Sequence, residues 1–308
     1  MIFSASNISK TFPRSNFNLS VPKIELPEGS IVGVVGENGN GKTTLLNIIA
    51  GELLADGQYS YFGSNATGNS NWMELKSQIA FIPQRIPRWF GSLIQNLQLK
   101  AALDGIAPTE IDTYLDEILE FLGLMDYKHL KWTEISTGYR LRFELARMLI
   151  GKPKLLVLDE PLANLDINTQ QKFLSDLKNI LKNKDYQTAV ILSSQQLHEI
   201  ETVSDQMIFL RKGQAVFSGS ITNLESENEK LVFELQVNHE QLEDFLKYVT
   251  HQTWEYKQTG EYIQVMIDKP DENTEKASND FLTSAIKHGF IIKYFRNISK
   301  STKRLFNQ

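Results

Sequence analysis

The sequence predicts an α/β fold with a mostly parallel sheet core, an antiparallel edge sheet and a helical subdomain, followed by a small α+β domain. Three observations predict it. An apolar run at residues 31–35 leads into a glycine-rich loop and a helix. Strand-like runs at 155–158 and 189–192 are separated by a helix from about 168 to 181, a spacing typical of parallel strands. Beyond residue 219 the order is β-α-β-β-α-β, the ferredoxin-like arrangement.

The composition is that of a globular chain with room for a second, smaller domain, with 308 residues of which 41% are hydrophobic. A net charge of −5 provides no overall basic field for a polyanion, so nucleic acid is not expected as a partner. The absence of cysteine excludes disulfides and thiolate chemistry. No apolar run approaches the roughly 20 residues of a membrane span. The first four residues, MIFS, begin no signal peptide, and direct membrane insertion is not expected.

The glycine-rich loop at residues 36–44, GENGNGKTT, fits the P-loop pattern G-x-x-x-x-G-K-[ST]. Its glycines let the backbone point successive N–H groups at a phosphate. Lys42 would add a cation on a surface loop, Thr43 would offer its hydroxyl to Mg²⁺, and the following helix would face its positive end to the same anion. The alternative, a glycine-rich turn with a chance lysine, is disfavoured by the strand before it and the helix after it. The expected phosphate-binding residues are Gly36, Glu37, Asn38, Gly39, Asn40, Gly41, Lys42, Thr43 and Thr44.

The elements on either side of the loop follow from local patterns. Weak alternation at 2–8 and a short run at 23–26 predict an antiparallel edge sheet, with Phe12 in a loop between them. Residues 57–63 predict another edge strand, and residues 65–71 predict a polar loop. A short buried strand at 79–83 ends at Gln84, after which the chain is helical from about 87 to 150.

Two carboxylates, Asp159 and Glu160, follow the apolar run at 155–158. Adjacent acids after an apolar strand are often only a solvated turn. Beside a P-loop they have the Walker B arrangement, in which Asp159 would hold Mg²⁺ directly or through water. Glu160 would then polarise the water that attacks the γ-phosphate.

With these motifs in this order, residues 1 to about 220 resemble the nucleotide-binding subunit of an ATP-binding cassette (ABC) transporter, which implies a P-loop NTPase fold of the ABC cassette type. Five further pieces lie where that family has functional motifs. They are the Q-loop residue Gln84, the signature at 135–139 (ISTGY), the D-loop at 164–166 (NLD), the H-loop at 192–195 (LSSQ), and Phe12 at the aromatic that stacks on adenine.

The resemblance implies ATP and Mg²⁺ as cofactors and assigns the remaining roles. Lys42, Gln84, Glu160 and Gln195 are the expected catalytic residues, and Thr43, Gln84 and Asp159 the expected metal site. Phe12, Ser136, Gly138 and Asp166 join the P-loop as nucleotide-binding residues. Packing remains the alternative for Phe12, since a single aromatic in a loop usually packs.

Two positions depart from the family pattern. The signature has Thr137 for its first glycine and Tyr139 for its glutamine, a variant similar to those of bacterial exporters of drugs, antibiotics or polysaccharides. The H-loop histidine is Gln195, whose amide donates a hydrogen bond but cannot become a cation. We therefore expect slow ATP hydrolysis.

The expected domains are an ABC cassette over 1–219, with its helical subdomain at about 87–150, and a ferredoxin-like accessory domain over 220–308. In the accessory domain we expect strands at 231–237, 254–258, 261–267 and 290–295 and helices at 240–249 and 273–287. Residues 298–306 resemble the C-terminal helix of cassettes from the same exporter branch. No catalytic constellation is found in this domain.

The expected function is an ATPase that forms a homodimer on ATP binding and powers a separate membrane permease, an exporter, from the cytoplasmic face of the cell membrane. In the family, Ser136 and Gly138 of one chain would complete the ATP site of the other. One alternative is a soluble ABC-type ATPase acting on ribosomes or DNA, and another is a nucleotide-binding regulator without turnover. Neither the cargo nor the permease follows from the sequence.

The segment at residues 85–90, RIPRWF, follows Gln84 at the place where cassettes of the family receive their permease. Two large aromatics beside two arginines have the composition of an interface anchor. We therefore expect Trp89 and Phe90 to contact the permease, with packing inside the helical subdomain as the alternative for Trp89.

Overall fold

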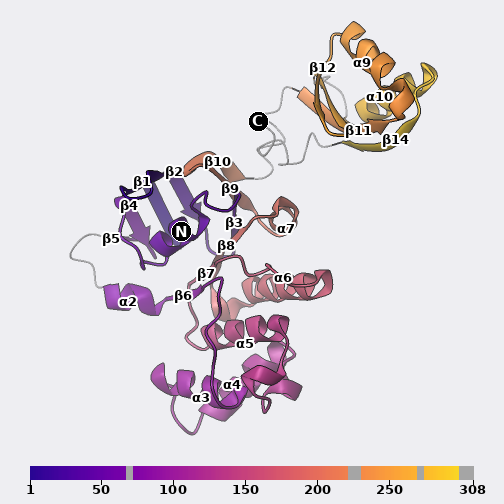
Figure 1. Cartoon of the computed structure of the whole chain (residues 1–308). Helices are drawn as coiled ribbons and strands as arrows, with labels where there is room; N and C mark the ends of the chain where they lie inside the picture. The colour runs from indigo at the N-terminus through magenta and orange to yellow at the C-terminus, as the bar shows by residue number, and fades with distance from the viewer. Residues whose placement is uncertain (67–71, 221–229, 269–273, 298–308) are drawn as a thin grey trace. The chain divides into compact units, whose positions relative to one another are not determined.

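The computed structural model describes residues 1–66, 72–220, 230–268 and 274–297. The chain divides into two compact units, Met1–Gly219 and Ser220–Gln308 (Figure 1). Each unit has its own hydrophobic core, and each is described by itself below.

The first unit is built on one mixed sheet with the strand order β5-β4-β1-β2-β10-β9-β3-β8-β7-β6. At one side β1 pairs antiparallel with β2 and β4. At the other side β3, β6, β7, β8 and β9 pair in parallel. The strands are β1 (Phe3–Phe12), β2 (Phe17–Leu26), β3 (Ile31–Val35), β4 (Asp56–Tyr61), β5 (Ser64–Ala66), β6 (Ile79–Ile82), β7 (Leu155–Leu158), β8 (Ala189–Ser194), β9 (Gln206–Arg211) and β10 (Gln214–Ser220).

The central strands are buried along their whole length because helices cover both faces of the parallel part of the sheet. Continuous runs of Val, Ile and Leu supply this double burial. The helices of the unit are α1 (Lys42–Ile49), α2 (Trp72–Ser77), α3 (Leu93–Leu103), α4 (Ile111–Phe121), α5 (Thr137–Leu149), α6 (Ile167–Lys182) and α7 (Leu197–Glu201). Helices α3, α4 and α5 pack together as the helical subdomain (Figure 1).

Three of the boundaries that differ from the sequence prediction lie in the antiparallel edge sheet. Strand β2 begins at Phe17, not at residue 23, and β1 continues to Phe12 because the two strands pair along their whole length, with Phe12 opposite Phe17. Phe12 therefore ends a strand and does not lie in a loop. Two residues of the predicted polar loop, Asn65 and Ala66, belong to β5, which pairs with β4. Local composition could not reveal these extensions, because cross-strand partners supply their hydrogen bonds.

The second unit has the order β11 (Lys230–Val237), α9 (Leu242–His251), β12 (Glu255–Thr259), β13 (Tyr262–Asp268), α10 (Thr274–Lys287), β14 (Ile292–Asn297). Its antiparallel sheet has the strand order β12-β13-β11-β14. This is the ferredoxin-like topology that the sequence predicts. One face of the sheet packs on α9 and α10 through a core that includes Phe233, Phe245 and Phe281. The helix predicted at 298–306 lies outside the described residues.

In the part of the chain that the structure describes, no helix combines the length and apolar character of a membrane span.

Candidate functional site

The predicted P-loop lies between β3 and α1, at the carboxyl edge of the parallel sheet. Its glycines meet specific steric needs: Gly39 and Gly41 have φ of +80° and +98°, which side-chain-bearing residues rarely adopt. A Cβ on Gly36 would lie 2.5 Å from the carbonyl oxygen of Leu210. The loop therefore has its compact form because three positions carry no side chain.

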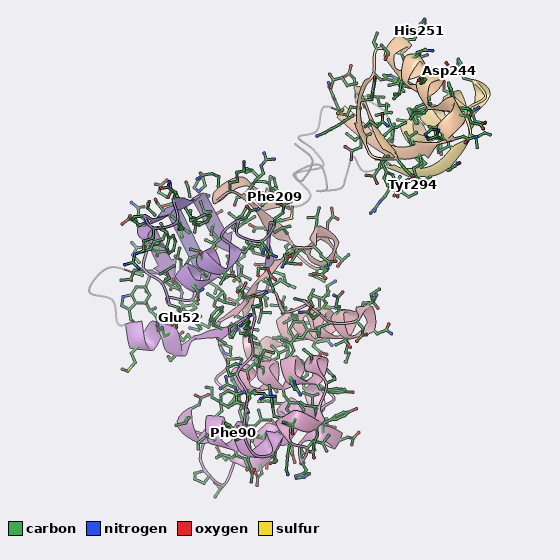
Figure 2. The ribbon with its side chains drawn as sticks, in the orientation of Figure 1. Glu52, Phe90, Phe209, Asp244, His251 and Tyr294 are labelled. Carbon is green, nitrogen blue, oxygen red and sulfur yellow. The ribbon has the colours of Figure 1, made fainter. Side chains whose placement is uncertain are left out.

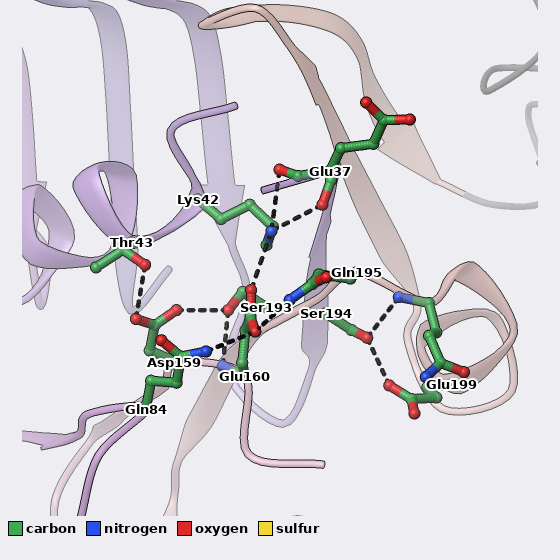
Figure 3. A network of polar contacts seen from close by, with 12 residues as sticks. Glu37, Lys42, Thr43, Gln84, Asp159, Glu160, Ser193, Ser194, Gln195 and Glu199 are labelled. Atoms are coloured by element: carbon green, nitrogen blue, oxygen red, sulfur yellow. Dashed lines mark hydrogen bonds and ion pairs between the residues drawn. The ribbon is translucent and has the colours of Figure 1, made fainter. Parts of the chain in front are cut away.

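Strand β3 is followed by the P-loop, β7 by Asp159 and Glu160, and β8 ends in Ser193 and Ser194 before Gln195. Gln84 follows β6. These strands are parallel neighbours, so their carboxyl ends meet at one edge of the sheet. This topology brings six residues that the sequence predicts for catalysis or metal binding into one polar network (Figure 3). They are Lys42, Thr43, Gln84, Asp159, Glu160 and Gln195.

Lys42 is buried, contrary to the surface position expected for it: its side chain is 4% exposed. Its ammonium donates to the carbonyl oxygens of Gly36 at 2.7 Å and Glu37 at 3.2 Å. It also pairs with Glu160 Oε1 at 3.0 Å, and the Glu160 side chain is 6% exposed. The ammonium has three protons, so these three acceptors use its full donor capacity.

Glu160 has φ of +46°, in the left-handed region, and its two carboxylate oxygens have different partners. Oε1 faces Lys42, while Oε2 accepts from the side-chain amides of Gln84 at 2.9 Å and Gln195 at 2.7 Å. The proposed catalytic carboxylate is thus oriented by one cation and two amides, from the ends of three different elements. The amide that replaces the family's histidine is one of its direct partners.

Asp159 lies between Thr43 and Ser193. The Thr43 hydroxyl donates to Asp159 Oδ2 at 2.8 Å, and the Ser193 hydroxyl donates to Oδ1 at 2.7 Å. Ser193 Oγ in turn accepts from the backbone N–H of Glu160 at 2.8 Å, which fixes the turn after β7. Ser193 was not among the site residues expected from the sequence. Its place at the carboxyl end of the strand beside β7 was the available signal.

The residues present fit a phosphate ligand with Mg²⁺. Helix α1 has no side-chain cap and no acidic residue in its first turn, whereas Ser92, Ser136 and Asp166 cap α3, α5 and α6. Uncapped N–H groups beside a lysine are suited to a phosphate. The Thr43 hydroxyl and Asp159 carboxylate, already in contact, are the oxygen ligands that Mg²⁺ prefers together with phosphate oxygens.

The predicted signature residues lie elsewhere, at the start of α5. Ser136 caps this helix, with its hydroxyl accepting from Tyr139 N at 3.4 Å. Gly138 faces α6 so closely that a Cβ would lie 2.2 Å from Thr169 Cγ2. Thr169 donates through its hydroxyl and N–H to Asp166, and these bonds hold the Asp166 pKa below its ordinary value. Signature and D-loop residues therefore adjoin within one chain, outside the network around Lys42.

Tyr139, at the signature position where the family has glutamine, is held inside the helical subdomain. Its hydroxyl lies 2.6 Å from that of Tyr127, and the two ring centroids are 4.2 Å apart. This hydrogen bond raises the pKa of Tyr127 above its ordinary value.

The aromatic pair at the end of the β1–β2 hairpin includes a residue that sequence analysis missed. The rings of Phe12 and Phe17 are 6.1 Å apart. Phe17 reaches the P-loop, because a Cβ on Gly41 would lie 2.8 Å from Phe17 Cζ. The cross-strand pairing of Phe12 with Phe17 connects the predicted adenine-stacking aromatic to the P-loop. This arrangement could not be predicted from the sequence, because the predicted strand began at residue 23 and not at Phe17.

Trp89 and Phe90 have different surroundings. The Trp89 indole N–H donates to Glu144 Oε2 at 3.0 Å, and the Arg147 guanidinium lies 4.4 Å from its ring centroid. Arg147 also pairs with Glu144, which is 1% exposed. Trp89 is therefore packed onto α5, whereas Phe90 is 91% exposed (Figure 2). The sequence alone does not indicate which of two adjacent aromatic residues packs against the protein and which is exposed.

Comparison with known proteins places this site in a family. A family model described as ABC transporter matches residues 19–163. The uncharacterized ABC transporter ATP-binding protein YxlF of Bacillus subtilis (strain 168) is 28% identical over 285 residues, covering 91% of this chain and 90% of YxlF. The tungstate uptake system ATP-binding protein TupC of Peptoclostridium acidaminophilum is 30% identical over 217 residues, covering 69% of this chain and 96% of TupC.

A solved structure shows the same fold. The structure of cbiO1 from Clostridium perfringens, part of the ABC transporter complex cbiONQ, matches with a TM-score of 0.67 and 21% identity, covering 73% of this chain and 91% of that chain. The P-loop, the two carboxylates after β7 and the match to nearly all of TupC agree with one another. The chain belongs to the ABC transporter family, as an ATP-binding subunit that hydrolyses ATP.

Proposed function

We propose that this chain hydrolyses ATP at the network around Lys42 and Glu160 and thereby powers a separate membrane permease. The observation that carries the proposal is the orientation of Glu160 by Lys42, Gln84 and Gln195 beside the Thr43–Asp159 pair. A carboxylate held in this way can polarise a water, while Lys42 and a Mg²⁺ held by Thr43 and Asp159 neutralise phosphate charge.

The direct test is phosphate release by the purified chain, with Mg²⁺ and with excess EDTA. We expect slow turnover that requires Mg²⁺. Nucleotide binding without phosphate release would instead identify a regulator that does not turn over.

We also propose that the working form is a homodimer with two composite ATP sites. The network contains the proposed catalytic residues, while Ser136 and Gly138 lie at the start of α5 and are not part of it. A second copy docked head to tail would bring its own Ser136 and Gly138 to the nucleotide. The equilibrium mass of the chain with ATP tests this proposal, most sharply in the Glu160→Gln variant.

The permease is proposed to be an exporter, with this subunit on the cytoplasmic face of the cell membrane. The Ser-Thr-Gly signature variant supports export, while the named relative TupC belongs to an uptake system, so import is the competing direction. In inside-out vesicles that carry the chain and its permease, ATP added outside should drive accumulation of the transported compound inside the vesicles if the system exports. A role on ribosomes or DNA is disfavoured by the net charge of −5.

Gln195→His is expected to raise the ATP turnover number by roughly tenfold or more, with little change in ATP affinity. A preorganised donor or its charge is typically worth about 2–4 kcal/mol in the transition state, and glutamine supplies the donor without the charge. Gln195 Nε2 lies 2.7 Å from Glu160 Oε2, so a histidine ring N–H at this position can preserve that contact. Steady-state phosphate release gives the rate.

The matched control is Gln196→His, which adds an imidazole at the exposed neighbouring position. It should leave turnover unchanged. If wild type already turns over briskly, or if Gln195→His leaves the rate unchanged or lowers it, another residue compensates for the missing histidine and our account of Gln195 is wrong.

Phe90→Ala is expected to weaken permease binding by about tenfold or more and to leave ATP turnover by the isolated chain within about twofold. Phe90 is a fully projecting apolar side chain, so its removal deletes an anchor and opens no internal cavity. Binding is measured by pull-down of the permease with the tagged chain from detergent-solubilised membranes of the source organism.

Leu103→Ala removes a comparably exposed apolar side chain, 75% exposed, from the same subdomain and should leave permease binding unchanged. Trp89→Ala should instead lower the melting temperature, because it leaves Glu144 and Arg147 without their indole partner. Equal permease binding by wild type and Phe90→Ala would remove Phe90 from the interface.

A further inference from the structure

The second unit contains a cavity of about 500 Å³ between α10 and the ends of β12 and β13. Its volume falls within the range of pockets that enclose small organic molecules, and it is much larger than one bound ion needs. The cavity is built entirely within this unit, so it does not belong to the ATP site described above.

Two aromatic residues, Trp254 and Phe281, contribute to the lining of the cavity. Phe281 is 3% exposed, and its ring lies 5.3 Å from Trp254 and 4.7 Å from Phe233. Trp254 also packs edge-on against Tyr248 at 5.9 Å. Met266 and Ile267, from β13, add apolar surface. These ring contacts hold Trp254 and Phe281 in place, so little conformational entropy of these two side chains is lost when a ligand binds.

The polar lining is negative. Lys230 lines the cavity but is neutralised by Glu255, whose Oε1 lies 2.5 Å from its Nζ. The other two charged residues of the lining are Asp268 and Asp280, and neither has an ion-pair partner among the described residues. They come from different elements, the end of β13 and the middle of α10. Among the described residues, the lining therefore combines two aromatic side chains with three carboxylates and one ammonium, which is a net negative charge.

We propose that the ferredoxin-like unit binds an organic cation with an aromatic or aliphatic body in this cavity. Aromatic faces and carboxylates attract the same class of ligand, because the ring faces carry negative electrostatic potential. Phosphates, nucleotides and other anions are repelled by Asp268 and Asp280. A neutral apolar molecule gains the contacts with Trp254 and Phe281 but no favourable interaction with the carboxylates of the lining. The site is independent of ATP hydrolysis, and its test does not use that activity.

The probe is benzyltrimethylammonium, titrated against the full-length chain and followed by saturation-transfer NMR. Benzyl alcohol and benzoate present the same ring without charge and with negative charge. We expect saturable binding, with the highest affinity for the cation, a lower affinity for the neutral alcohol and the lowest for the anion. Absence of saturable cation binding up to about 10 mM, or binding of benzoate as tight as that of the cation, overturns the proposal.

Two variants locate the site. Asp268→Asn with Asp280→Asn should weaken cation binding by about tenfold while leaving benzyl alcohol binding unchanged. Trp254→Leu should weaken cation binding about two- to fivefold. A paired control, Asp244→Asn with Glu243→Gln, removes two negative charges from exposed positions on α9 outside the cavity and should have no effect. Figure 2 labels Asp244. Equal loss in the control pair, or unchanged binding in the cavity variants, would place the cation elsewhere and refute this assignment.

Discussion

Lys42→Ala is expected to reduce ATP turnover to background, a loss of at least about 10²-fold, because it removes the cation beside the phosphates from an otherwise preorganised loop. It should also destabilise the first unit by about 1–3 kcal/mol, since Glu160 is left buried with its amide donors but without its cation. Mg²⁺-dependent phosphate release measures the first effect and chemical denaturation the second. The stability cost was not foreseen from the sequence, which placed Lys42 on an exposed loop.

The double variant Lys42→Ala with Glu160→Gln separates the two effects. It removes the unpaired carboxylate, so stability should recover in part, while activity should stay at background. Retained turnover in the single variant would refute the P-loop assignment. Recovery of activity in the double variant would show that the single variant had failed through misfolding alone.

Glu160→Gln is expected to lower turnover by about 10²-fold or more and to trap an ATP-bound dimer. The amide preserves the size of the side chain but cannot polarise the attacking water. It also removes the anion that competes for Lys42, which sits 3.0 Å from Glu160 Oε1 in this structure, so nucleotide should bind more tightly. Light scattering after size exclusion, with ATP and without it, reports the dimer.

The matched control is Glu52→Gln, a similar change at an exposed carboxylate of the same unit (Figure 2). It should show neither reduced turnover nor a trapped dimer. A Glu160→Gln protein that remains monomeric with ATP at every concentration tested would contradict the composite site, while leaving the ATPase assignment intact.

The network at the sheet edge was predictable because its parts are local. A loop of fixed spacing after an apolar strand, and two acids after another, determine where Lys42, Asp159 and Glu160 lie. Parallel topology then brings the ends of these strands together without further information. The ferredoxin-like order of the second unit was predictable for the same reason, since alternating helix and strand periods define each element.

Features that depend on partners distant in the sequence were not predictable. Phe17 reaches Gly41 only because β2 begins earlier than its weak pattern suggests. Trp89 has a different environment from Phe90 because its indole bonds to Glu144, which lies 55 residues further along the chain. The cavity in the second unit is formed by residues from five different elements or turns, none with a motif of its own. Sequence patterns predict which side of a helix or strand is buried and how motif residues are spaced. These three features depend instead on tertiary contacts between distant segments.

The buried pair of Lys42 and Glu160 has a consequence for nucleotide selectivity. A ligand that uses the Lys42 ammonium must compete with an internal carboxylate that already holds it, so observed affinity is the intrinsic affinity multiplied by the fraction of molecules in which the pair is open. We expect a polyphosphate that makes several contacts to meet this cost more readily than a single inorganic phosphate. Glu160 and the nucleotide phosphates therefore compete for the same ammonium, which favours ligands that offer more than one phosphate contact.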